Sequence, residues 1–156
     1  MKPIFKLIIS IAIPLAIGAV SGYFTIESVQ TWYTTLNKPS FNPPNGIFAP
    51  VWTTLYIMMG IACFLIWRKD VENAQKKKAL IFYSIQLILN FLWSFIFFYL
   101  HQKGAALAEI ILLWIFILLT IISFSKISKA AAWLLVPYIL WVSFATLLTY
   151  SIWKLN

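Results

Sequence analysis

Five long apolar runs divide the chain, and short polar segments separate them. The runs cover residues 4–24, 47–67, 79–100, 105–125 and 130–153. As a helix rising about 1.5 Å per residue, each run is long enough to cross a hydrocarbon core of about 30 Å. Because a segment in lipid must satisfy its own backbone polar groups, the pattern predicts five transmembrane helices.

The first of these runs has a second interpretation. Lys2 and Lys6 precede an apolar stretch that ends in small residues around Ser21, which is also typical of a secretory signal with its cleavage site. The run is long for a signal, however, and this length favours a transmembrane helix that is retained.

The composition indicates the same class of protein. Hydrophobic residues make up 62% of the chain and charged residues 10%, and the mean hydropathy is +0.89. A soluble domain of this size needs far more charged surface. We therefore predict an all-α integral membrane protein, in which a bundle of five transmembrane helices forms a single domain over residues 1–156.

The net charge of +8 comes from short basic clusters beside the apolar runs, such as residues 76–78. Such clusters fit contact with the lipid bilayer, and we expect no nucleic acid as a partner. Nine of the twelve basic residues fall on the side of the membrane that holds the N-terminus. The positive-inside bias therefore predicts a protein of the cell membrane with a cytoplasmic N-terminus and with residues 25–46 outside.

The titratable residues show no pattern typical of catalysis or metal binding. No nucleophile motif or phosphate-binding glycine loop accompanies the four scattered acids, which are Glu27, Asp70, Glu72 and Glu109. Cys63 lies in mid-helix, where the role of a small buried apolar residue is expected. His101 lacks a second ligand beside it, so a solvated loop histidine is favoured over a metal or haem ligand. We predict no metal site, no required cofactor and no ordinary enzyme activity.

Polar and aromatic residues inside the runs are the main candidates for function, because lipid makes them costly unless they face the bundle interior. In the third run they recur at intervals of three and four and share one helical face: Tyr83, Gln86, Asn90, Trp93, Ser94 and Phe97. In the fifth run a second face recurs every four residues: Trp133, Pro137, Trp141 and Ala145. For any one of these residues alone, helix packing and interhelical hydrogen bonds remain the simpler explanation.

The depth of these residues favours a shared site. Trp141 lies about 12 residues, roughly 18 Å, from the outer end of its run, which is too deep for an interfacial tryptophan. Trp52 lies about five residues, roughly 8 Å, below the outer end of the second run, and Asn90 and Trp93 fall between. We predict one cavity in the outer half of the bundle, with the proline- and aromatic-rich residues 25–46 as its lid.

Three further features concern packing. Gly18 and Gly22 form a G-x-x-x-G pattern, for which close helix packing is favoured over a direct ligand contact. Pro14 and Pro137 predict local kinks that open space between helices. Glu109, the one acid within a run, is either an interfacial carboxylate or a polar contact at the cavity.

The same residues form motifs that resemble those of a known family. The motifs are Trp32-Tyr33-x-x-Leu36-x-Lys38-Pro39, Asn42-Pro43-Pro44, Phe48-x-Pro50-Val51-Trp52-Thr53-x-Leu55-Tyr56, Asn90-x-x-Trp93-Ser94 and Val136-Pro137-Tyr138-x-x-Trp141-x-x-Phe144-Ala145-Thr146. Through all five runs the chain is similar to the translocator protein family, also called tryptophan-rich sensory proteins or peripheral benzodiazepine receptors.

The resemblance implies a five-helix bundle, commonly a homodimer, whose interior pocket binds porphyrins such as protoporphyrin IX and, in relatives, sterols and aromatic drugs. On this chain the implied pocket residues are Tyr33, Trp52, Tyr56, Asn90, Trp93, Ser94, Trp141 and Ala145. Two residues depart from the family pattern, which often has tryptophan in place of Phe41 and asparagine in place of Thr149. The first departure weakens a stacking surface in the lid, and the second puts a polar contact in doubt.

Three classes of function stay open. The leading hypothesis is a membrane receptor or carrier for tetrapyrroles in transport, sensing or stress regulation, with the macrocycle stacked on Trp52 and Trp141 and its carboxylates near Lys38, Lys103 or water. The second, which the resemblance implies for some relatives, is light- and oxygen-dependent degradation of bound porphyrin, with the same two indoles taking part. The third is a structural membrane partner or small-solute channel whose aromatic interior is simply core.

Overall fold

The computed structural model describes residues 1–156, and most of the chain is helical, without a strand. Six α-helices follow one another: α1 (Pro3–Gln30), α2 (Phe48–Trp67), α3 (Asn73–Ser94), α4 (Lys103–Ser125), α5 (Lys129–Leu134) and α6 (Val136–Leu155). Short turns of other helix types precede α2 (Asn45–Ile47) and continue α3 (Phe95–Tyr99). Five segments are long and apolar enough to cross a membrane, which confirms the predicted all-α membrane bundle.

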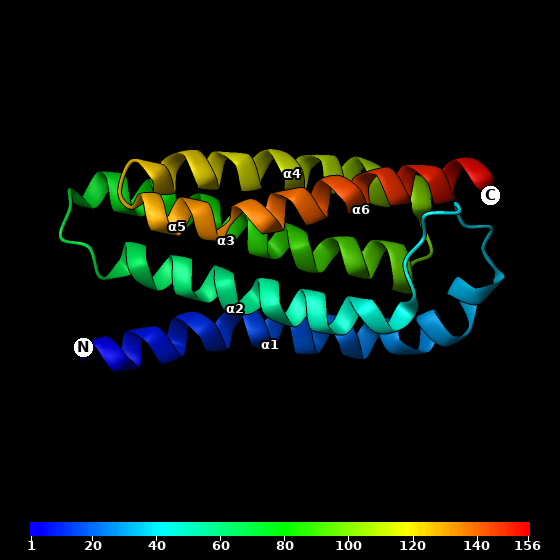
Figure 1. Ribbon diagram of the computed structural model, residues 1–156, viewed down its shortest axis with the longest axis horizontal. Coiled ribbons are helices and arrows are strands. Elements are labelled where there is room, and N and C mark those ends of the chain that lie inside the picture. Colours follow the sequence, from blue (N-terminus) through cyan, green and yellow to red (C-terminus); the bar gives the residue numbers. More distant parts are fainter.

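The helices lie side by side along one axis, and the N- and C-termini are at opposite ends of the bundle (Figure 1). α1 packs against α2 and α3, α3 packs against α4, α4 packs against α5 and α6, and α2 packs against α5. These contacts close the helices into a ring. A ring of this kind can enclose an interior space wherever its members do not meet at the centre.

One glycine allows two neighbouring helices of the ring to approach closely. A Cβ atom added at Gly60 of α2 would lie 2.6 Å from the Ile11 Cα and 2.7 Å from the Ser10 carbonyl oxygen, both in the backbone of α1. No side chain fits there, so glycine allows the two backbones to touch. This contact joins α1 and α2 in the half of the bundle that contains the N-terminus.

Two helices are longer than the apolar runs that predict them. α1 continues through Gln30 and passes Pro14 as one helix, while α3 begins at Asn73 and includes the lysines of residues 76–78. Polar residues with good helix propensity extend a helix beyond the hydrocarbon core, which hydropathy alone does not detect. The connection after α1 is therefore shorter than the predicted residues 25–46. From here on, the lid means residues 31–44.

The fifth span is divided into α5 and α6 at Leu135. Pro137 has no backbone N–H, and its ring clashes with the carbonyl of Trp133 in a continuous helix, so the break predicted from this proline is present. The break changes the helical register. Trp133 is 71% exposed on the outside of the bundle, so its predicted place on the interior face with Trp141 is wrong.

Candidate ligand-binding site

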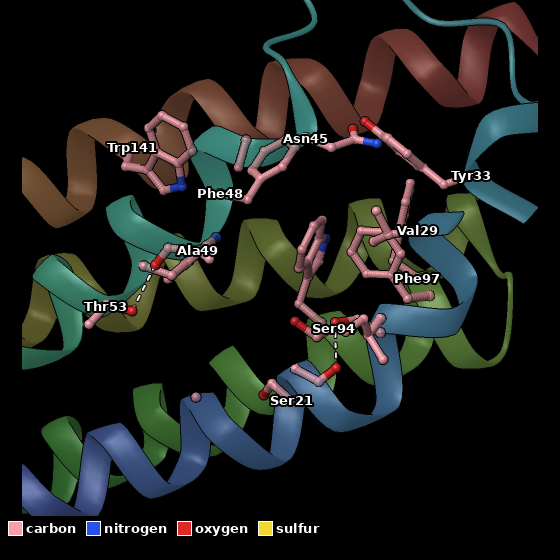
Figure 2. Close-up of a pocket in the computed structure, with 18 of the residues that line it drawn as sticks. Ser21, Val29, Tyr33, Asn45, Phe48, Ala49, Thr53, Ser94, Phe97 and Trp141 are labelled. Carbon is pink, nitrogen blue, oxygen red and sulfur yellow. Dashed lines mark hydrogen bonds between the residues drawn. The ribbon is translucent and has the colours of Figure 1, made fainter. Parts of the chain in front are cut away.

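A cavity of about 480 Å³ lies inside the half of the bundle that the lid covers. Its walls come from α1, α2, the end of α3 with the turn that follows it, and α6, and 17 of its 25 lining residues are hydrophobic. Figure 2 shows labelled side chains from these elements pointing toward the same space: Ser21, Val29, Phe48, Ser94, Phe97 and Trp141. A mainly apolar hollow with a few polar groups is typical of a small-molecule site.

The structure brings most of the predicted site residues to this cavity. Seven of the eight line it: Tyr33, Trp52, Tyr56, Trp93, Ser94, Trp141 and Ala145. The eighth, Asn90, does not line the cavity and lies behind Tyr56, with which it shares a hydrogen bond. The predicted convergence of the outer halves of the second, third and fifth spans is therefore present.

A chain of buried hydrogen bonds forms the floor behind the cavity. The Tyr56 hydroxyl donates to Asn90 Oδ1 over 2.6 Å, and Asn90 Nδ2 donates to the Tyr138 hydroxyl over 2.8 Å. The Tyr138 hydroxyl in turn donates to Gln86 Oε1 over 2.7 Å. The network joins α2, α3 and α6 and fixes the ring of Tyr56, because each buried polar group depends on its neighbour for satisfaction.

Three indoles give the cavity its aromatic surface. Trp52 lies at a ring-centroid distance of 5.6 Å from Tyr56, and Trp141 lies 6.3 Å from Phe48. Trp93 stacks on Phe97 at 5.3 Å, and its Nε1 is buried without a hydrogen-bond partner in the protein. An unpaired N–H in an apolar cavity is costly unless a ligand or water accepts from it. The site therefore combines stacking faces with at least one free donor.

Small residues form the wall that α1 contributes. A Cβ added at Gly18 would lie 2.6 Å from the Tyr56 ring, so this glycine accommodates the tyrosine, as the packing interpretation of the G-x-x-x-G pattern predicts. Gly22 differs, because nothing lies within 4 Å of an added Cβ and the residue borders the cavity. Gly22 therefore keeps volume free for a ligand.

The lid is anchored by its own residue Tyr33, whose side chain is almost fully buried. The Tyr33 hydroxyl donates to Asn42 Oδ1 over 2.9 Å, and Lys38 Nζ donates to the Tyr33 carbonyl over 2.8 Å while lying 4.6 Å from the centre of the ring. Burial raises the pKa of the Tyr33 phenol, and the hydrogen bond to Asn42 opposes that rise. The phenol therefore stays protonated at neutral pH and holds the two ends of the lid together.

Contacts at both sides fix the lid to the bundle. His101 stacks on Trp32 with centroids 4.1 Å apart and takes a left-handed backbone conformation, with φ of 58°. The prediction of a merely solvated histidine thus misses its packing against the lid. At the C-terminal end of α6, Asn156 Nδ2 donates to the Asn37 carbonyl over 2.9 Å, and the Asn37 amide donates to Asn156 Oδ1 over 3.0 Å.

The structure also shows where four other residues of the sequence analysis lie: Glu109, Lys103, Thr149 and Phe41. Both carboxylate oxygens of Glu109 are buried without a partner, and the residue does not line the cavity, so neither predicted role fits. Lys103 lies 5.6 Å from the Trp32 ring outside the cavity. Thr149 lines the cavity, but its hydroxyl donates to the Ala145 carbonyl of its own helix. Phe41 packs near Phe144, 6.1 Å between centroids.

The contribution of α1 to the cavity is the part that sequence reasoning missed. The cavity is bordered by Ser21, Gly22, Thr25 and Val29, and the last two follow Ser21 at intervals of four, which places these residues along one side of the helix. The sequence feature that could have predicted this wall is the occurrence of small and hydroxyl-bearing residues at this spacing in an otherwise apolar run. The Ser21 hydroxyl is buried without a partner and adds a second free polar group to the wall.

Comparison with known proteins gives consistent matches along the chain. The sequence profile of the TspO/MBR family matches residues 10–154. The chain is 45% identical to the tryptophan-rich protein TspO of Chlorobaculum tepidum, over 99% of this chain and 98% of that protein. It is 46% identical to the protein of the same name from Archaeoglobus fulgidus, over 98% of each chain. It is 39% identical to the translocator protein of Homo sapiens, over 80% of this chain and 75% of the human protein.

Proposed function

The chain belongs to the TspO/MBR family, and on that basis we propose that it is a membrane receptor or carrier for a flat hydrophobic ligand of the porphyrin class. The observation that carries the proposal is the cavity, which has a mainly apolar lining and presents three indoles beneath a lid. Its volume of about 480 Å³ falls within the usual range of about 300–1,000 Å³ for small-molecule sites.

The arrangement of the walls favours a planar aromatic ligand. Trp52 and Trp141 come from different helices, α2 and α6, and both line the cavity. Offset or edge-on contacts with these rings stabilise a macrocycle by about 0.5–1.5 kcal/mol each beyond simple burial. Trp93 adds a third indole to the lining, where its ring stacks on Phe97.

The charged side of such a ligand faces the lid. The carboxylates of a porphyrin require water or a cation, and the deeper walls of the cavity offer neither. Lys38 is held against Tyr33, a lining residue, so it places a cation at the lid end of the cavity. Lys38 keeps part of its donor capacity, because an ammonium has three N–H groups and two of its bonds go to the Tyr33 and Leu36 carbonyls.

The proposed membrane orientation follows from the basic residues. The end of the bundle that holds the N-terminus carries nine of the twelve basic residues, and the lid lies at the opposite end. We place the N-terminus in the cytoplasm and the lid outside, in agreement with the positive-inside bias. The cavity then receives its ligand from the outer half of the membrane or from the outer surface.

Replacing two of the indoles that line the cavity tests the proposal. Protoporphyrin IX is titrated into purified protein, and the shift of its absorption band reports binding. We expect the double variant Trp52→Phe and Trp141→Phe to bind about tenfold more weakly or worse, because two stacking surfaces shrink. The matched control is Trp133→Phe with Trp153→Phe, two exposed indoles outside the cavity. Equal affinity of both double variants and the unmodified protein would refute the assignment of the cavity.

A further inference from the structure

A second concave surface lies at the other end of the bundle, remote from the ligand cavity. It is a groove between the N-terminal parts of α1 and α3, and Trp67 at the end of α2 also lines it. None of its lining residues borders the cavity described above. Nearer the lid, α1 and α3 touch through Phe24, whose ring lies 6.2 Å from Phe91, so the groove occupies the part where the two helices leave space.

Three lysines line the mouth of this groove: Lys6 of α1 and Lys76 and Lys77 of α3. Lys76 Nζ donates to the Trp67 carbonyl over 3.0 Å, and Lys6 Nζ lies 5.5 Å from the centre of the Trp67 ring. Trp67 thus draws two ammonium groups from different helices to one place. Each ammonium has three donors, so most of their N–H groups remain free for an anion.

The charge around the groove is strongly positive. Nine basic residues lie at this end of the bundle, and the acids there are Asp70 and Glu72, which leaves an excess of seven positive charges (nine minus two). Such an excess attracts the anionic headgroups of a membrane. The tryptophan at the same level is typical of the boundary between headgroups and hydrocarbon.

Below the lysines the groove becomes apolar. Ile81, Ile85 and Ile88 follow one stripe of α3, and Ile81 and Ile88 are 48% and 59% exposed. Ser84 lies between them, but its hydroxyl donates to the Leu80 carbonyl of its own helix. The stripe from Ile81 to Ile88 extends about 10 Å along the helix, away from the headgroup level. This length accommodates the first part of an acyl chain.

The combination of three lysines with an apolar stripe favours one class of ligand over the others. A nucleic acid or an acidic peptide would use the lysines and leave the isoleucine stripe empty, while a neutral lipid would leave the lysines without a partner. From the charge and the continuous apolar stripe we infer that the groove binds an anionic diacyl phospholipid, with its phosphate between Lys6, Lys76 and Lys77 and one acyl chain along Ile81, Ile85 and Ile88. This site is independent of the proposed porphyrin function.

Native mass spectrometry of the purified full chain tests the inference. The probes are dioleoyl-phosphatidylglycerol and dioleoyl-phosphatidylcholine, which share acyl chains and differ in charge, together with glycerol phosphate as a headgroup without chains. The groove variant is Lys6→Gln with Lys76→Gln and Lys77→Gln. The control variant removes the same number of charges from the same end outside the groove, at Lys69, Lys126 and Lys129.

We expect the groove variant to lose at least about tenfold in phosphatidylglycerol affinity while the control variant loses less than about threefold. A charge-preserving variant, Lys6→Arg with Lys76→Arg and Lys77→Arg, should retain binding, and an unchanged thermal unfolding midpoint of the glutamine variant shows that its loss is not one of folding. Equal losses in the groove and control variants, or equal affinity for the two lipids, would overturn the proposal. Displacement of the lipid by glycerol phosphate at similar concentration would also overturn it, because the acyl contacts would then contribute nothing.

Discussion

Replacing Gly22 with leucine is expected to weaken porphyrin binding about 10- to 100-fold while the bundle stays folded, because the added side chain takes up cavity volume and costs about 1.4–2.8 kcal/mol of binding free energy. Gly22 borders the cavity, and nothing lies within 4 Å of an added Cβ. A larger side chain there meets no protein atom at its base and occupies space that the ligand needs. The measurement is a protoporphyrin IX titration beside a thermal unfolding curve in the same detergent.

The neighbouring residue supplies the control. Tyr23 is 79% exposed and faces away from the cavity, so Tyr23→Leu changes the same stretch of α1 without altering the site. We expect its affinity for porphyrin to stay within about twofold of the unmodified protein, in line with the small effect of exposed substitutions. A folded Gly22→Leu protein with unchanged affinity would show that the ligand binds elsewhere.

Replacing Gly60 with alanine is expected to destabilise the bundle by about 1–3 kcal/mol, the usual cost of overpacking. An added Cβ lies 2.6 Å from the Ile11 Cα and 2.7 Å from the Ser10 carbonyl oxygen. Both atoms belong to the backbone of α1, so relief requires the whole helix to shift. Thermal unfolding in detergent should show a lower midpoint, although alanine has the higher intrinsic helix propensity.

Gly22→Ala is the matched control for this second prediction. It makes the same chemical change in a helix where an added Cβ has open space, so we expect an unchanged or slightly higher unfolding midpoint. If Gly60→Ala unfolds at the same temperature as Gly22→Ala, the close contact between α1 and α2 at Ile11 is not present in the folded protein.

The membrane constraint explains why so much of the fold is predictable from sequence. Lipid forces each long apolar run into a helix, and it makes buried polar residues such as Gln86 and Asn90 face the interior, where the structure places them. The same reasoning locates the indoles Trp52 and Trp141 at the level of the cavity. Because lipid constrains each helix separately, its effect is visible in the order of apolar and polar residues along the sequence.

Features that depend on how two helices pack against each other are harder to predict from the sequence. The break at Leu135 rotates Trp133 outward, and a four-residue spacing measured across that break gives the wrong face. The polar wall of α1 escaped notice because serine, glycine and threonine are also common where helices simply pack. The contact between Asn37 and Asn156 joins residues more than a hundred positions apart, and no local pattern marks it.

The most direct test of the central claim is a crystal structure of the protein soaked with protoporphyrin IX. The account predicts density for a planar macrocycle inside the cavity, in contact with Trp52 and Trp141, with its carboxylates directed toward the lid. Density for the porphyrin on the lipid-facing surface alone, with the cavity unchanged, would contradict it.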